Sequence, residues 1–472
     1  MITFIISIAV LVLGYFVYGA FVDRKFGSDS GRETPAYSKH DGIDYVPMKT
    51  GKIFLVQFLN IAGLGPIFGA IAGALWGPVA FIWIVLGSVF AGGVHDYFSG
   101  MLSVRHGGSS VPEIVGKYLG KSMKNFMRVF ALILLILVGV VFVKGPAAIL
   151  NELTSLDTPY WVIIIFLYYV LATMLPVDKL IGRIYPLFGL SLLIMAAGIF
   201  WVLLIGNYKI PEITINSFRN MHYEPEKFPV FPLLFITIAC GAISGFHSTQ
   251  SPLMARCIPS ESEGKKIFFG AMIAEGIVAL IWAAAAMSFF GGVRELGETM
   301  AGEGNNAAWV VNQVCSTMLG KIGGVLAIMG VVAAPVTSGD TAFRSARLTI
   351  ADSLNIQQSK LIQRLVITIP IFIVALLITS INFDIVWRYF GWSNQTLATI
   401  ILWAATVYMV HVEKNYLIPL IPAIFMTLVV TTYIFVAPEG FRLSYLLSLS
   451  IGIAFTLLIS AWFFRLKLNL LK

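Results

Sequence analysis

The chain has 472 residues, of which 58% are hydrophobic and only 12% are charged, and its mean hydropathy is +0.86. A soluble domain this apolar would lack the polar residues to cover its surface, so the composition excludes the soluble classes. No polar linker separates one half from the other, which indicates a single membrane domain over 1–472. The net charge of +8 suits anionic lipid head groups, and without a basic patch interleaved with aromatic residues we expect no nucleic-acid partner.

Apolar segments of roughly 20 residues, enough to cross a bilayer, predict an all-α chain with about thirteen transmembrane helices. They lie at 2–22, 53–75, 78–103, 126–150, 159–175, 184–206, 231–254, 267–291, 321–339, 363–381, 389–411, 417–436 and 443–464. The first segment has no positively charged region before it and no Ala-x-Ala site after it, so we expect a retained helix and not a cleaved signal peptide.

Lys and Arg are distributed unevenly among the predicted loops. With the N-terminus outside the cell, 24 of the 32 Lys and Arg residues fall on the cytoplasmic side, seven fall outside, and Lys144 lies within a span. Cytoplasmic loops of membrane proteins collect these cations. The sequence therefore predicts a multi-pass protein of the cell inner membrane, with its N-terminus outside and its C-terminus inside.

Two predicted spans are interrupted at mid-membrane depth. The run 57–66 in the second span contains two glycines and a proline, and the run 241–252 in the seventh is the most polar stretch inside any helix. Backbone groups freed by such breaks cost several kcal/mol in hydrocarbon, so they must face protein, water or a ligand. The residues that we expect to contact a substrate are Asn60, Gly63, Gly65, Ser244, Phe246, His247, Ser248 and Gln250.

The two interrupted spans begin two sets of five helices that pair in order. The first set covers 53–206 and the second 231–411, with the helix 2–22 before them and two helices over 417–464 after them. Corresponding members start on opposite sides of the membrane, which predicts a five-plus-five inverted repeat of the LeuT type. The alternative is that both breaks are packing kinks, since Gly and Pro are common in membrane helices.

Four motifs carry a resemblance to a known family. They are Gln57 to Gly73, Gly92 to Met101 with His95-Asp96 inside it, Gly241 to Arg256, and Ser338-Gly-Asp340-Thr341 to Leu348. These motifs resemble the carbon starvation protein A (CstA) family of peptide and pyruvate transporters, many of whose members are longer. The resemblance implies uptake of peptides or pyruvate during nutrient limitation, driven by an ion gradient.

Ionisable residues inside a membrane span are expensive and are functional candidates. His95 and Asp96 stand together in the third span and suit a proton relay, although neighbours on a helix point about 100° apart and need not touch. The alternative is that each pairs with a structural arginine. Glu275, in the eighth span, is either a proton carrier or a partner for Arg256 or Arg344.

The ninth span ends on charged residues in helical spacing. Asp340, Arg344 and Arg347 share one face at its expected inner end, where they suit a cytoplasmic gate. Hydroxyls just before them suit a sodium site against the broken second span, as in LeuT-type folds. The residues of that possible sodium site are Ala62, Gly63, Thr337, Ser338 and Thr341.

His247 is expected in the unwound part of the seventh span, where it would contact substrate or a proton. No second ligand stands at close spacing from it, so the sequence predicts no metal site and no cofactor beyond H⁺ or Na⁺ as coupling ion. Lys144 either reaches toward the outer membrane surface or attracts a substrate carboxylate. The HExxH and GxSxG patterns are absent, which argues against a membrane-embedded enzyme.

Sequence patterns predict local structure in two further segments. Ser110-Val-Pro-Glu113 predicts a capping box that opens an amphipathic cytoplasmic helix. The polar run 389–396 begins the eleventh span and predicts either contacts to a peptide-like ligand or a helix cap. Together these features favour a proton-driven symporter for peptides or pyruvate that works by alternating access. The alternatives are a sodium-coupled carrier of another amino-acid-like solute and a transporter-like nutrient sensor.

Overall fold

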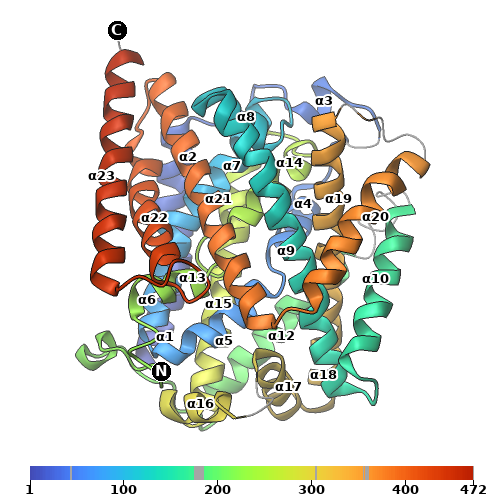
Figure 1. The fold of residues 1–472 in the computed structure, drawn as a ribbon, viewed down its shortest axis with the longest axis vertical. Helices are drawn as coiled ribbons and strands as arrows, with labels where there is room; N and C mark the ends of the chain where they lie inside the picture. The colour runs from blue at the N-terminus through green and yellow to red at the C-terminus, as the bar shows by residue number, and fades with distance from the viewer. Residues whose placement is uncertain (43–44, 175–184, 303–305, 355, 357–360, 471–472) are drawn as a thin grey trace.

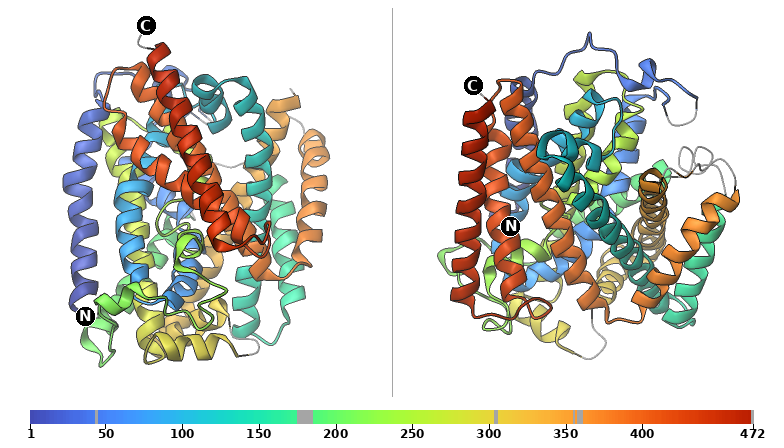
Figure 2. Two further views of the ribbon diagram at one scale, coloured as in Figure 1. Left: turned by 60° about the vertical axis from the view of Figure 1, so that its left-hand side comes forward. Right: turned by 45° about the horizontal axis from the view of Figure 1, so that its top comes forward.

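A computed structural model describes residues 1–42, 45–174, 185–302, 306–354, 356 and 361–470. Every regular element in these ranges is a helix, and the helices stand side by side in one bundle with the two chain ends at opposite ends of it (Figure 1). α10 (Thr158–Met174) and α20 (Leu361–Thr379) form the edge of the bundle farthest from α23 (Tyr445–Leu470) (Figure 2).

All predicted spans overlap helices. The first is continuous from α1 (Ile2–Leu13) through a π-helical turn into α2 (Ala20–Phe26). The other spans that follow their predictions closely are α9 (Lys121–Leu153), α12 (Tyr185–Ile205), α15 (Gly270–Phe289), α20, α22 (Leu417–Val436) and α23. The loop expected between 175 and 184 lies outside the described residues.

In the part of the chain that the structure describes, nine helices are long and apolar enough to cross a membrane, or ten if one bent pair forms a single span. The remaining three predicted spans are a short helix (α10), a split helix (231–254) and α21 (Phe383–His411), which has polar residues in its middle. The count of thirteen and the orientation therefore stay predictions.

The first predicted break is confirmed. α4 (Thr50–Ile61) ends just before Gly63, and a second helix runs from Gly65 to Trp76 at an angle of 55° to it. Pro66 stands at the start of the second helix, where its missing N–H costs nothing because the first-turn donors of a helix have no partner within it.

The second break is real but shorter than predicted. α13 (Val230–Thr237) is followed by a non-helical stretch, and α14 begins at Gly245 and continues to Ala255, so His247 to Pro252 are helical and not unwound. The hydroxyls of this polar run bond to carbonyls of their own helix, as Ser248 does to Gly245 and Ser251 to His247. Because these bonds satisfy the polar side chains inside the helix, the run needs no unwinding.

The two breaks cross each other. A Cβ added to Gly65 would collide with the side chain of Cys240, and one added to Gly69 would lie 2.9 Å from the carbonyl oxygen of Thr237. Only glycine leaves room for this approach, since a side chain at either position would push the two broken helices apart.

The ninth span continues past its predicted end. α18 (Gly320–Ala327) leads through a π-helical turn into α19 (Ala334–Leu354), so Asp340 lies inside a long helix and not at its inner end. The apolar pattern stops at the charged residues, but they remain compatible with helix, so hydropathy placed the end too early. The outer helix expected after residue 307 is present as α17 (Ala307–Met318), next to α16 (Val293–Met300).

Replacing Gly92 by alanine should destabilise the protein. Gly92 ends the π-helical turn between α6 (Val79–Leu86) and α7 (Gly93–Arg105), and an added Cβ would collide with the carbonyl oxygen of Ala242 in the second break. Overpacking of this kind costs about 1–3 kcal/mol. Gly324 in α18 has nothing within 4 Å of an added Cβ, so Gly324→Ala should leave stability equal or raised. Thermal unfolding in detergent compares the two, and a Gly92→Ala protein as stable as the parent would contradict the close approach.

Asn394 of α21 closes the start of α14, as the helix-cap interpretation of the polar run 389–396 requires. Its Oδ1 accepts the backbone N–H of Phe246 at 2.6 Å, and its Nδ2 donates to the hydroxyl of Ser244 at 2.9 Å. Asn394→Ala leaves the buried N–H of Phe246 without its partner and removes the bond to Ser244, so we expect a loss of about 1–3 kcal/mol in unfolding free energy. Thr396→Ala is the matched control because its hydroxyl bonds to its own helix at Trp392. Equal stability of the two variants would show that the cap contributes nothing.

Candidate functional site

Four buried ionisable side chains from three helices form one chain of contacts. Nδ1 of His95 lies 2.7 Å from Oδ1 of Asp96, and Nδ1 of His247 lies 2.8 Å from Oδ2 of the same carboxylate. On its other side, Nε2 of His247 lies 3.3 Å from Oε2 of Glu275. The order is therefore His95, Asp96, His247 and Glu275, across α7, α14 and α15, and all four side chains are fully buried.

The geometry of these four side chains offers one position for a shared proton. An ionised Asp96 only accepts hydrogen bonds, so each histidine donates to it from Nδ1. Nε2 of His247 then faces Glu275 as the remaining ring nitrogen. One proton placed between Nε2 and Oε2 satisfies both atoms, either as imidazolium with carboxylate or as imidazole with carboxylic acid.

The sequence predicted proton coupling for His95, Asp96 and Glu275 and a substrate or proton contact for His247, and the structure brings the four side chains together. The neighbours His95 and Asp96 do touch. The arginine partners suggested for Glu275 are wrong, because Arg256 donates to the carbonyl of Gly108 at 3.1 Å and Arg344 pairs with Asp340. Nothing in the spacing of the sequence could have shown that α14 places its histidine between two carboxylates.

The positions expected to contact substrate are shielded from solvent. Asn60 on α4 and Gln250 on α14 are buried, and each has a side-chain oxygen without a hydrogen-bond partner among the described residues. The amide nitrogen and oxygen of Gln57, one turn before Asn60, are also buried without a hydrogen-bond partner. α4 packs against α14, and these two helices at the breaks carry the three amides. A polar solute bound here would supply the hydrogen-bond partners that these amide atoms lack.

The other expected substrate positions have partners within the protein. Gly63 faces the ring of Phe142, which also packs edge-on against Phe246 with ring centroids 6.0 Å apart. Ser244 bonds to Asn394. Ser248 bonds to its own helix. These residues shape the break, while the unpaired amides are the groups left for a ligand.

The residues of the possible sodium site come together in part. The hydroxyl of Ser338 lies 3.2 Å from the carbonyl oxygen of Leu59, near the end of α4. The hydroxyls of Thr337 and Thr341 donate to carbonyls of their own helix. Ala62 and Gly63 stand three and four residues after Leu59, so the sodium site stays a prediction that rests on this one crossing contact.

The charged face of α19 forms an ion pair within itself. Nη2 of Arg344 lies 3.3 Å from Oδ2 of Asp340 and 3.3 Å from the carbonyl oxygen of Ala172 in α10. The pair thus joins α19 to α10 and stands on a different helix from the buried chain described above. Its role as a gate stays a prediction.

Lys144 on α9 is engaged by the end of a neighbouring helix. Its ammonium group donates to the carbonyl oxygen of Thr379 at 2.9 Å and to that of Ile381. These carbonyls lie at the C-terminal end of α20 and just after it. The C-terminal end of a helix carries partial negative charge, which stabilises a nearby cation. This contact favours a structural role for Lys144 over attraction of a substrate carboxylate.

Cys240 lies beside the buried chain. Its Sγ and the nearest ligand atoms of His247 and Glu275 all stand within 4.8 Å of one another. No spacing pattern indicates this group, because six residues stand between Cys240 and His247 and Glu275 is on another helix. It is the group among the described residues that could hold a metal ion.

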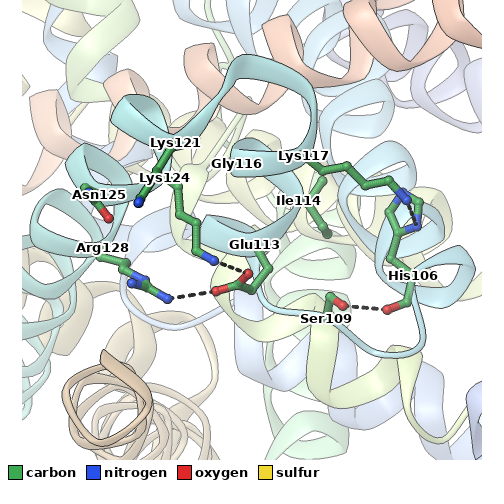
Figure 3. Close-up of a pocket in the computed structure, with 10 residues that line it drawn as sticks. All are labelled: His106, Ser109, Glu113, Ile114, Gly116, Lys117, Lys121, Lys124, Asn125 and Arg128. Atoms are coloured by element: carbon green, nitrogen blue, oxygen red, sulfur yellow. Dashed lines mark hydrogen bonds and ion pairs between the residues drawn. The ribbon is translucent and has the colours of Figure 1, made fainter. Parts of the chain in front are cut away.

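A hollow lies between α8 (Val111–Leu119) and the first turns of α9. It measures about 660 Å³ and is lined mainly by basic side chains (Figure 3). The predicted capping box is wrong here, since Glu113 does not reach back to Ser110 but pairs with Lys124 at 2.5 Å and Arg128 at 2.9 Å. Two cations at this distance outweigh the amide that a capping box would offer.

Burial and neighbouring charges shift the pKa values of Glu113 and His106 in this hollow. Partial burial raises the pKa of Glu113, but its bonds to Lys124 and Arg128 outweigh burial and hold the pKa below its ordinary value. Burial and the nearby ammonium of Lys117 lower the pKa of His106 to about 4. At neutral pH the hollow therefore holds neutral His106, one carboxylate and several cations.

Comparison with known proteins gives several relatives. An uncharacterised membrane protein of Haemophilus influenzae is 46% identical over 340 residues, which cover 61% of this chain and 91% of that protein. The peptide transporter CstA of Campylobacter jejuni is 29% identical over 58% of this chain and 48% of its own length. The pyruvate/proton symporter BtsT of Escherichia coli is 26% identical over 59% of this chain. That match covers 48% of BtsT, so the chain aligns with about half the length of these two transporters.

Among solved structures, a mutant of the Eremococcus coleocola manganese transporter aligns with a TM-score of 0.54, covering 89% of this chain and 94% of that one at 14% identity. At this identity the likeness shows the fold alone, and that fold is the LeuT type that the broken helices predict. The family model described as carbon starvation protein CstA matches residues 1–145, 143–320 and 304–433. This chain therefore belongs to the carbon starvation protein CstA family, and its family and fold are those of transporters and not of enzymes.

Proposed function

We propose that this chain is a secondary active transporter that imports peptides or pyruvate by proton symport and alternating access. Its relatives include a protein named as a peptide transporter and one named as a pyruvate/proton symporter. The observation that carries the proposal is the buried chain of His95, Asp96, His247 and Glu275 beside the second helix break. We place the protein in the cell inner membrane with its N-terminus outside, as the distribution of Lys and Arg favours.

The buried carboxylates link proton binding to the separation of the helices around them. With one proton between His247 and Glu275, that pair is neutral as a whole, and Asp96 is bonded to two histidines. Removing the proton leaves an additional buried negative charge, and an uncompensated buried charge costs several kcal/mol. The proton therefore leaves only when water reaches the site, which requires the helices around it to separate.

The substrate would bind where the two broken helices cross. The N-terminus of α14 carries partial positive charge and suits a carboxylate, which pyruvate and peptides share. The unpaired amide atoms are the nitrogen and oxygen of Gln57 and the oxygens of Asn60 and Gln250, and they would bond to the remaining polar atoms of the solute. His247 belongs to α14 as well, so one short helix carries both the proton site and part of the substrate site.

Sodium coupling is the second candidate. The contact of Ser338 with the carbonyl oxygen of Leu59 favours it, since a hydroxyl and an exposed carbonyl at a helix break are oxygen ligands of the kind that hard cations take. In that case the driving ion would bind between α4 and α19, away from the histidines. A nutrient sensor with a transporter fold remains the other alternative and would bind the same solutes without accumulating them.

Uptake of labelled pyruvate and of labelled di- and tripeptides into proteoliposomes tests the proposal. We expect saturable accumulation under an imposed proton gradient and none under a sodium gradient alone. Accumulation under sodium only would replace the proton with sodium as coupling ion. Tight binding of a solute without accumulation under either gradient would favour the sensor.

Glu275→Gln should abolish proton-driven accumulation while it preserves exchange of solute across the membrane. The amide keeps the shape of the side chain, but it cannot exchange a proton with His247. Glu298→Gln is the control, because Glu298 is exposed on α16 and pairs only with its neighbour Arg294 among the ion pairs of the described residues. Proton-driven uptake in the Glu275→Gln protein at the level of the control would remove Glu275 from the coupling pathway.

A further inference from the structure

Three side chains with metal-binding atoms meet where the second helix break adjoins α15. They are the thiol of Cys240, the imidazole of His247 and the carboxylate of Glu275, and their nearest ligand atoms all lie within 4.8 Å of one another. All three residues are buried. Sulfur, imidazole nitrogen and carboxylate oxygen in one group are the donors that zinc takes, whereas Ca²⁺ and Mg²⁺ favour oxygen alone.

The group contains polar atoms that lack partners. Among the described residues, Nε2 of His247 and both carboxylate oxygens of Glu275 make no hydrogen bond, although Nε2 and Oε2 are 3.3 Å apart. Buried polar atoms in proteins almost always have a partner. Nε2 and Oε2 face each other with the thiol nearby, so a cation among the three side chains would be an alternative to the shared proton as a partner for these atoms.

The surroundings hold the ligands in the orientation that a metal requires. Nδ1 of His247 bonds to Asp96 at 2.8 Å, which directs the lone pair of Nε2 away from Asp96 and toward Glu275. A carboxylate behind a histidine is the usual support of a metal-bound imidazole. Nδ2 of Asn394 lies 3.5 Å from Sγ of Cys240, and an N–H directed at sulfur suits a thiolate.

We propose that Cys240, His247 and Glu275 bind a divalent transition-metal ion of the zinc class. Bonds of about 2.3 Å to sulfur and about 2.0 Å to nitrogen and oxygen place tetrahedral ligand atoms about 3.5 Å apart, so a separation at the 4.8 Å bound would shorten by about 1 Å on metal binding. Three protein ligands leave one position open to water or to a carboxylate of a solute. The inference concerns what this site binds and does not depend on which solute the chain transports.

Titration of the purified protein with Co²⁺, a spectroscopic probe for zinc sites, tests the inference. The probe protein carries Cys257→Ser and Cys315→Ser, so that Cys240 is its only thiol among the three cysteines of the sequence. We expect a thiolate-to-Co²⁺ charge-transfer band that saturates at one equivalent and disappears when Zn²⁺ is added. Absence of this band in folded protein would overturn the inference.

Two variants locate the site. Cys240→Ser, made with Cys257 and Cys315 intact, should lose the charge-transfer band, and persistence of the band would assign it to another cysteine and contradict the proposal. Asp96→Asn should weaken Co²⁺ binding by about 10- to 100-fold, the usual effect of removing the support of a metal-bound histidine. An unchanged affinity in Asp96→Asn would show that His247 is not a ligand. If Cys240→Ser does not fold, X-ray absorption of the Zn²⁺-loaded probe protein decides, because it should show one sulfur neighbour at about 2.3 Å.

Failure of this test and failure of the transport proposal are distinguishable. Co²⁺ binding is measured on protein in detergent without any gradient or solute, whereas proton coupling is measured as accumulation in liposomes without added metal. Metal binding without proton-driven uptake would leave the inference standing and remove the proton from the transport mechanism. Proton-driven uptake without a Cys240-dependent band would support the transport proposal and overturn the metal site.

Discussion

The carboxylate of Asp96 is the contact on which the centre of this protein depends. It lies fully buried and is held from both sides by Nδ1 of a histidine, His95 from its own helix and His247 from α14. Burial of an ion costs several kcal/mol unless hydrogen bonds replace its water. The bond from His247 fixes the register of α14 against α7, and the second nitrogen of His247 extends the same constraint to Glu275 on α15.

The close contact of the broken helices is what makes this register possible. Gly65 and Gly69 let the first broken helix approach the backbone at Thr237 and Cys240, and Gly92 does the same for α7 against Ala242. Small residues replace side-chain packing by backbone contact, as is usual where membrane helices approach closely. The non-helical stretch before α14 would otherwise expose its backbone, and Asn394 closes it by accepting from Phe246.

Sequence patterns predicted the elements better than they predicted the site. Every span predicted from hydropathy overlaps a helix, and Gly63, Gly65 and Pro66 located the first break, because these signals act within one segment. The same signals predicted an end before Asp340 and an unwound segment around His247, and both residues lie inside helices. Charge and polarity along the sequence do not show which partners on other helices satisfy these side chains. The meeting of Cys240, His247 and Glu275 depends on how three helices pack, and no spacing in the sequence encodes it.

The position of His247 ties the proposed steps of transport to one short helix. α14 begins at the break, is capped by α21 through Asn394, and carries both the histidine and the unpaired amide oxygen of Gln250. A movement of α14 away from α15 would separate Nε2 from Glu275 and expose the amides of α4 together. Proton release and substrate release would then share one motion, which is the condition for symport. A metal ion held by Cys240, His247 and Glu275 would fasten α14 to α15 at the same point, so it would oppose that motion by occupying the electron pairs that the proton otherwise uses.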